Sequence, residues 1–200
     1  MRYPEFFNEV EPIDTFDPLA QTLGAVEDGR ITYEYLDMVK LAGHSCPTVA
    51  GAWLMSKIGL QKLYAEELPV RGDIKVELRG ALDEGVEGVI GSCIGLVTGA
   101  ANEGGFKGLG GKFARNDRLH YGADIEGDVR LTRMDSGESV ELAYDPSVVP
   151  GSQKMQMLMQ KLMQGGATQD ERREFGELWQ ERVKKILLQK ELWEKMVKVF

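Results

Sequence analysis

The chain has 200 residues, of which 42% are hydrophobic and 28% are charged, and its formal net charge is −8. This composition is typical of a folded protein with a buried core, and it excludes a chain that is disordered along its length. The acidic balance argues against a nucleic acid as partner, because phosphate backbones are usually bound by a basic surface. The sequence has no run of about 18 apolar residues that could span a membrane, and its acidic N-terminus is unlike a signal peptide. We therefore expect a cytoplasmic protein that engages no membrane.

Cysteine and histidine are rare in this sequence. Cys46 and Cys93 are the two cysteines, and His44 and His120 are the two histidines. Two cysteines cannot build a framework of disulfides, so in a reducing compartment we expect them to be thiols or metal ligands.

The first third of the chain predicts short elements followed by one long helix. An Asp-Pro pair opens residues 17–27, which predicts a helix with a good N-cap and proline at its first position. Alternating apolar residues over 31–35 predict a strand, and residues 36–41 predict a short helix. Apolar residues then recur at helical spacing over 47–64, again with proline at the start, which predicts a long helix.

The middle of the chain predicts strands around an apolar, glycine-containing segment. Residues 73–79 alternate apolar and charged side chains, which predicts a half-exposed strand. Residues 85–99 are mostly apolar and contain several glycines, and this pattern fits a buried helix or a strand. Residues 129–133 and 139–144 flank an Asp-Ser-Gly turn and predict a β-hairpin.

The C-terminal quarter has a different composition. Proline and glycine over 145–151 indicate a boundary, after which Met, Gln, Glu and Lys dominate. Residues 155–163 carry a helical apolar stripe, and a capping box at 168–171 opens a second helix that should reach residue 187. The tail over 192–200 keeps a helix-like apolar pattern.

Together these elements predict an α+β fold, with an antiparallel or mixed sheet packed with helices and a C-terminal helical extension. We place the core at residues 1–150 and the helical extension at residues 151–200. A methionine-rich stripe is typical of a packing surface, so these helices should cover the sheet or a second protein chain.

His44 and Cys46 form the strongest chemical motif, because they lie where a loop becomes a helix. The start of a helix favours the thiolate form of cysteine, which ligates metals or attacks electrophiles. An H-x-C pair offers an imidazole nitrogen and a sulfur, donors that suit zinc, nickel, copper or iron.

These two donors supply only half of the ligands that a four-coordinate metal site needs. The remaining ligands would come from water or from side chains elsewhere, for which the candidates are Cys93, His120, Asp117 and Asp124. For Cys93 and His120, burial as a small hydrophobe and a structural hydrogen bond are the alternative interpretations.

A second candidate site is the loop over 99–111, which holds six glycines and is followed by Lys112. Glycine lets a backbone adopt a positive φ or approach a ligand closely. The segment lacks the spacing of a phosphate-binding Walker loop, since Phe106 and Phe113 occupy two of the required positions. We mark Lys112, Gly110, Gly111 and Asn102 as candidate ligand-binding residues for a small anion. The basic residues over 107–118 are otherwise a solvated loop face.

The segment GHSCPTVAGAWLM, residues 43–55, resembles the signature that opens the FmdE family of proteins, which is associated with formylmethanofuran dehydrogenase. The positions that match this signature are Gly43, His44, Cys46, Pro47, Ala50 and Gly51. Thr48 replaces the glycine that is usual there. Residues 94–117 are similar to the family's second block, and the whole resemblance covers roughly residues 30–145.

The resemblance implies an α+β core that dimerises, with the histidine and cysteine of the first block lining a metal-binding cleft. Aligning the Thr-Gly pair at 98–99 puts Ala100 and Val89 where the family has the cysteines of the second block. Ser92 then stands at the family's aspartate, and Cys93 is out of register. Many members also carry a C-terminal zinc finger with four cysteines, whereas residues 151–200 contain no cysteine.

Three functional hypotheses follow. The first is a homodimeric accessory or carrier protein for a molybdenum or tungsten redox system of the formylmethanofuran or formate type. In this hypothesis His44 and Cys46 bind a transition metal. Zinc is the metal we expect first, and nickel, iron or a metal-containing cofactor are the alternatives. The second is an enzyme that uses Cys46 as nucleophile and His44 as base on a small anionic substrate. The third is a docking module whose methionine-rich C-terminal helices bind a larger redox complex.

Overall fold

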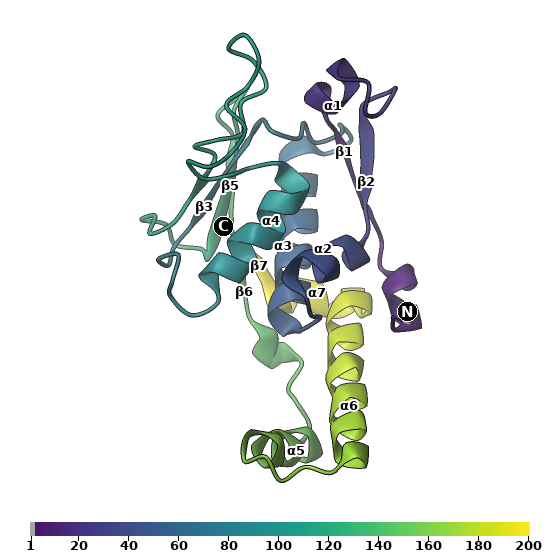
Figure 1. The fold of residues 1–200 in the computed structure, drawn as a ribbon. Helices are drawn as coiled ribbons and strands as arrows, with labels where there is room; N and C mark the ends of the chain where they lie inside the picture. Colours follow the sequence, from purple (N-terminus) through teal and green to yellow (C-terminus); the bar gives the residue numbers. More distant parts are fainter. Residues whose placement is uncertain (1–2) are drawn as a thin grey trace.

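The computed structural model describes residues 3–200, and it confirms the predicted α+β fold (Figure 1). The N-terminal elements are the 3-10 turn η1 (Glu5–Glu9), the strand β1 (Ile13–Phe16), the helix α1 (Pro18–Thr22) and the strand β2 (Arg30–Tyr33). β1 and β2 pair antiparallel as a two-stranded sheet. Oδ1 of Asp17 caps α1 by accepting hydrogen bonds from two backbone amides. The helix ends earlier than predicted, shortly before Gly24 adopts a left-handed φ of 70°.

Three helices form the centre of the molecule. They are α2 (Tyr35–Ala42), α3 (Pro47–Tyr64) and α4 (Glu87–Thr98). α3 has the predicted bounds, and α4 resolves the choice between helix and strand in favour of helix. α3 contacts both α2 and α4, and it also contacts the main sheet, so most of its residues are buried.

The main sheet has five strands in the order β4-β3-β5-β6-β7. Their bounds are β3 (Ile74–Leu78), β4 (Leu119–His120), β5 (Val129–Arg133), β6 (Ser139–Tyr144) and β7 (Val197–Val199). β3 and β4 are parallel and the other neighbours are antiparallel. The predicted hairpin of β5 and β6 is confirmed.

The pattern of β3 explains how the sheet separates its two faces. Ile74, Val76 and Leu78 are fully buried, whereas Lys75 and Glu77 point to the other face. On that face the register places Arg130 of β5 opposite Glu77, and Arg130 binds this carboxylate through Nε and Nη2.

α3 lies close to the sheet because two of its glycines face it. A Cβ on Gly51 would lie 2.3 Å from Cε1 of Tyr144 in β6. A Cβ on Gly59 would lie 2.6 Å from Cδ1 of Leu131 in β5. The two glycines are about two helical turns apart, so the same face of α3 carries both contacts.

The last part of the chain leaves the body and returns to it. It comprises the 3-10 turn η2 (Pro146–Val148), the helices α5 (Gln153–Met163) and α6 (Gln169–Leu188), the 3-10 turn η3 (Lys190–Leu192), the helix α7 (Trp193–Met196) and β7. α5 and the start of α6 form an arm that projects from the body (Figure 1). Met157 and Met163 on α5 are 69% and 77% exposed.

The predicted helical tail is wrong for its final residues, because Val197–Val199 is a strand that pairs antiparallel with β6. An open sheet edge offers unpaired backbone groups, and this segment satisfies them. Val183, Ile186, Leu187, Met196 and Val197 also belong to the same hydrophobic core as the first 150 residues. Residues 151–200 therefore contribute both an arm and a part of the core.

Candidate functional site

The segment between α2 and α3 contains the H-x-C motif, and most of its residues have a structural role. Gly43 ends α2 with a φ of 76°, a conformation that glycine adopts without strain. Cys46 caps α3, Pro47 occupies the first turn of that helix, and Ala50 is fully buried. Among the positions that match the family signature, only His44 neither caps a helix nor packs in the core.

His44 is exposed, and its ring is held by a local hydrogen bond. Its Nδ1 lies 2.9 Å from the carbonyl oxygen of Ala42. A ring that donates from Nδ1 to a carbonyl keeps its lone pair on Nε2, and this arrangement also orients histidines that ligate metals. Nε2 of His44 is thus the atom of the motif that a ligand can reach.

Cys46, in contrast to His44, is buried, with 9% of its surface accessible. Its Sγ accepts a hydrogen bond from the amide of Val49 at 3.4 Å, so the thiol is the N-cap of α3. Nδ1 of His44 contacts the carbonyl oxygen of Ala42, and no hydrogen bond between His44 and Cys46 is found within residues 3–200.

Ser45, between these two residues, ties the motif to the C-terminal helix α6. Its carbonyl oxygen accepts hydrogen bonds from Nε1 of Trp179 at 3.0 Å and from Nε2 of Gln180 at 3.1 Å. Its Oγ lies 3.0 Å from Oη of Tyr35. Three bonds therefore fix the backbone on which His44 and Cys46 are mounted. The sequence carried no signal for Trp179 and Gln180, because they lie more than a hundred residues further along the chain.

Cys93 lies in α4 and is 1% exposed. Burial raises the pKa of its thiol to about 12, and the nearby Cys46 adds to the effect. The side chain therefore stays a neutral thiol near pH 7, which is the alternative that the sequence left open for it.

His120, at the end of β4, lies in a separate surface pocket of about 550 Å³. Its Nε2 is 3.1 Å from the carbonyl oxygen of Asp117. Asn102 lines the same pocket, and its Oδ1 accepts a hydrogen bond from the amide of Gly104, which closes a local turn. The structure thus brings His120 and Asn102 together, and it places neither of them in a pocket with Lys112.

Within residues 3–200, no three side chains of His, Cys, Asp or Glu gather as a group that could hold a metal ion. Of the candidate ligands, His44 and Cys46 are two residues apart in the chain. Their nitrogen and sulfur atoms fit zinc or a similar ion, but a tetrahedral zinc site needs four ligands and this pair supplies two.

The glycine-rich loop has a conformation that explains two of its glycines. Leu109 and Lys112 exchange backbone hydrogen bonds of 2.8 and 2.9 Å around Gly110 and Gly111. Both glycines have a positive φ, of 54° and 79°, as a two-residue hairpin turn requires. Gly111 and Lys112 line a cavity of about 400 Å³ that also contains Arg71, Arg115 and Arg118.

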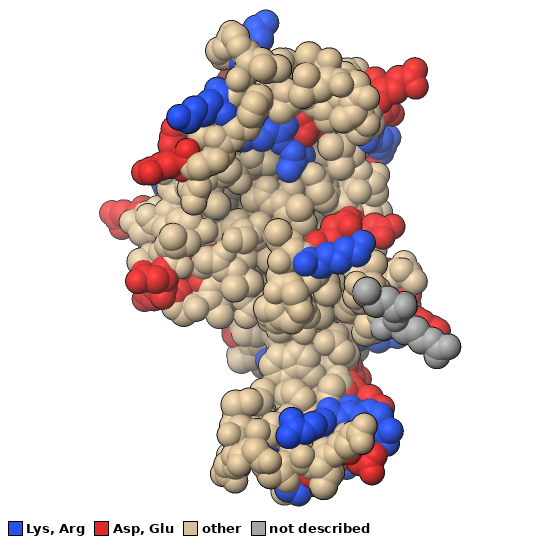
Figure 2. All heavy atoms as spheres, viewed as in Figure 1, with Lys and Arg blue, Asp and Glu red and all other residues tan. Residues whose placement is uncertain are grey.

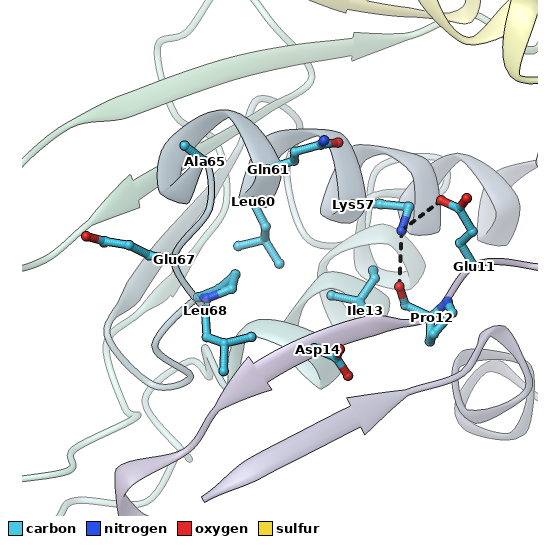
Figure 3. Close-up of a pocket in the computed structure, with 11 residues that line it drawn as sticks. Glu11, Pro12, Ile13, Asp14, Lys57, Leu60, Gln61, Ala65, Glu67 and Leu68 are labelled. Atoms are coloured by element: carbon cyan, nitrogen blue, oxygen red, sulfur yellow. Dashed lines mark hydrogen bonds and ion pairs between the residues drawn. The ribbon is translucent and has the colours of Figure 1, made fainter.

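A further groove lies between β1 and α3, and its charges are already matched. Figure 3 shows Nζ of Lys57 directed to Glu11, at 3.4 Å, and to the carbonyl oxygen of Pro12, at 3.1 Å. The groove has a volume of about 240 Å³ and contains no His or Cys. We therefore do not assign it a ligand.

The fold and the motif define an α+β protein with an anchored, exposed imidazole and a capping thiol at the start of its central helix. A family model matches residues 41–193, and its description is FmdE, molybdenum formylmethanofuran dehydrogenase operon. The chain belongs to the FmdE family, as the resemblance predicts. The match extends into the C-terminal helices, beyond the region of roughly residues 30–145 that resembles the family's motifs.

No curated protein and no solved structure matches the chain. Within residues 3–200, no helix is long and apolar enough to cross a membrane.

Proposed function

We propose that this protein is a metal-binding accessory of a redox enzyme system, with His44 and Cys46 as its metal ligands. The description of the family names the operon of a molybdenum formylmethanofuran dehydrogenase, which supports a role beside such an enzyme. A transition metal is the expected cofactor, and zinc fits the nitrogen and sulfur donors best.

The orientation of His44 carries this proposal. Its Nδ1 lies 2.9 Å from the carbonyl oxygen of Ala42, its side chain is exposed, and Cys46 lies two residues further along the chain. The other matched positions of the motif are explained by capping and by the core, which leaves His44 as the position that requires a ligand-binding explanation.

A second copy of the chain would complete the site. Two H-x-C pairs related by a two-fold axis supply two imidazoles and two thiolates, which is the donor set of a tetrahedral zinc site. A homodimer with one metal ion between the two copies is therefore the assembly that we propose. The exposed ring of His44 supports a ligand shared between two copies, whereas Cys46, with 9% of its surface accessible, must become more accessible before its sulfur can join the site.

The test measures bound metal by elemental mass spectrometry, and molecular mass by light scattering, on protein purified without a histidine tag. We expect about one metal ion for every two chains in the dimer. His44→Ala and Cys46→Ser should both lose this metal. Serine is a good N-cap, so Cys46→Ser removes the sulfur while keeping α3 capped.

His120→Ala is the matched control, because it removes the other histidine of the chain from a different pocket. It should keep the metal content of the unmodified protein. Metal retained equally by His44→Ala and by His120→Ala would contradict the proposal, as would a purified protein that takes up no metal.

A further inference from the structure

A cavity of about 400 Å³ lies between the turn before β3 and the glycine-rich loop. Among the residues that line it are Arg71, Asp73, Lys112, Arg115 and Arg118. Its volume is in the range of pockets that hold small ligands. Figure 2 shows Lys and Arg side chains in the upper part of the molecule, where Asp and Glu side chains also lie. Four of the residues that line the cavity are basic, in a chain whose net charge is −8.

Two of the arginines are held in place by one buried carboxylate. Asp17 is 2% exposed, and its Oδ2 accepts a hydrogen bond from Nη1 of Arg71 at 2.9 Å. Both of its oxygens accept from Nη2 of Arg115, at 2.7 and 2.8 Å. Nε and Nη2 of Arg71 donate to the carbonyl oxygen of Leu96. These contacts neutralise one of the two positive charges and give the wall of the cavity a fixed shape.

The charge of Arg118 is not matched in this way. Its Nε is shielded from solvent and has no hydrogen-bond partner within residues 3–200. Its guanidinium also takes part in none of the ion pairs found in that part of the chain. Asp73 also lines the cavity, and no ion pair within residues 3–200 joins it to Arg118, although Arg118 is near enough for its charge to favour the ionised form of that carboxylate. A buried donor without a partner is unfavourable, so it marks a place where an acceptor is expected.

The backbone holds Arg118 and Lys112 on the same cavity. The amide of Arg118 donates to Ala101 at 2.9 Å, and its carbonyl accepts from Val76 of β3 at 2.7 Å. Lys112 follows the tight turn at Gly110 and Gly111, and its side chain is exposed. Both cations therefore stand on anchored backbone, one inside the cavity and the other at its rim.

We propose that this cavity binds a tetrahedral oxyanion, either free or as the phosphoryl group of a small metabolite, through Arg118 and Lys112. A guanidinium can donate two parallel hydrogen bonds to two oxygens of such a group, and a lysine adds a mobile charge. Arg71 and Arg115 contribute positive potential, while Asp17 keeps them in position. This site is separate from the metal site, and neither proposal depends on the other.

The test is isothermal titration calorimetry of the full chain with inorganic phosphate at low ionic strength. We expect saturable binding at one site for each chain. Arg118→Gln should weaken it about tenfold or more, since a hydrogen-bonded charge contact is lost, and Lys112→Gln should weaken it several-fold. Molybdate and acetate are titrated in parallel. Binding of both tetrahedral anions supports a free oxyanion as the ligand, and binding of phosphate alone supports a phosphoryl group.

Lys107→Gln is the matched control, because Lys107 belongs to the same loop and is exposed but does not line the cavity. This variant should bind phosphate as the unmodified chain does. The melting temperature of every variant should lie within a few degrees of that of the unmodified chain. The proposal is overturned if the chain binds no phosphate, if Arg118→Gln binds it unchanged, or if acetate binds as tightly as phosphate.

Discussion

At the scale of single residues, the H-x-C motif divides into one residue that faces outward and several that build the fold. Cys46 both caps α3 and offers a sulfur, so its presence in the motif does not by itself indicate chemistry. His44 is exposed, and its Nδ1 is anchored to the carbonyl oxygen of Ala42. Cys93 differs from His44 because it is 1% exposed, so burial keeps its thiol from contact with ligands in solution.

The raised pKa of Cys93 predicts how stability depends on alkaline pH. Below about pH 9 the thiol is neutral in both states, and its contribution to stability is fully present. Above that value the unfolded chain loses the proton, whereas the folded chain keeps it until about pH 12. The free energy of unfolding should fall by about 1.4 kcal/mol for each pH unit between these limits.

Urea denaturation at pH 7, 9 and 10 measures this slope. Cys93→Ala is the appropriate control, because it removes the titrating group from the same place in α4. This variant should be less stable at pH 7 but should lose less stability between pH 9 and pH 10. An equal slope in both proteins would show that Cys93 is not the group responsible.

At the scale of elements, α3 is shaped by the surface on which it lies. Helix propensity alone disfavours glycine inside a helix by about 1 kcal/mol relative to alanine. Gly51 is nevertheless required by the ring of Tyr144, and Gly59 by the side chain of Leu131. The close approach of helix and sheet outweighs the local preference of the chain.

Gly51→Ala and Gly176→Ala should therefore change stability in opposite directions. The new methyl group at residue 51 would lie 2.3 Å from the ring of Tyr144, and overpacking of this kind costs about 1–3 kcal/mol. Gly176 lies inside α6, and a methyl group added there would have nothing within 4 Å, so alanine should stabilise by about 1 kcal/mol.

Thermal and urea unfolding of the two variants compare these effects directly. Because both substitutions replace a glycine inside a helix by alanine, the difference between them isolates the contact with Tyr144. If Gly51→Ala were as stabilising as Gly176→Ala, α3 would not lie as close to β6 as the structure places it.

At the scale of the whole molecule, the C-terminal quarter is a part of the core and not only an extension. Val183, Ile186 and Leu187 of α6 belong to the core that surrounds α3, and β7 adds the outer strand next to β6. α6 also holds Ser45 through Trp179 and Gln180. The position of the H-x-C motif thus depends on residues from the far end of the chain.

A chain that ends at Pro150 should fail to fold. It would lack the five apolar side chains that these residues add to the main core, and the loss of one such side chain commonly costs about 2–5 kcal/mol. The combined loss is about 10–25 kcal/mol, which matches or exceeds the about 5–15 kcal/mol by which domains of this kind are stable. Circular dichroism should show little structure and no cooperative unfolding.

Substitutions on the arm provide the contrast. Met157→Gln and Met163→Gln change exposed side chains of α5 and should alter stability by no more than about 0.5 kcal/mol. These variants also test docking of a partner enzyme better than truncation does, since they leave the core intact. A truncated chain that folds as stably as the full chain would contradict the role that we assign to residues 183–199.

Local patterns were sufficient to predict the class of fold, the long helix α3, the strand β3 and the hairpin of β5 and β6. Each of these elements carries a strong period of its own or a clear start signal, as at Pro47. The strand β7 was not predictable in this way, because three residues carry no period and their conformation is set by the edge of β6. For the site, the sequence identified His44 and Cys46 as a motif, but not that one is exposed and the other buried.

The sequence by itself determined the α+β class, the family, and the H-x-C pair at the start of a helix, because all of these depend on neighbouring residues. Only the tertiary structure decided which candidates share a surface. It separated His120 and Asn102 from Lys112, buried Cys93, and joined Arg71 and Arg115 to Asp17. The physical reason is that burial and ion pairing depend on contacts between distant parts of the chain, which no local pattern encodes.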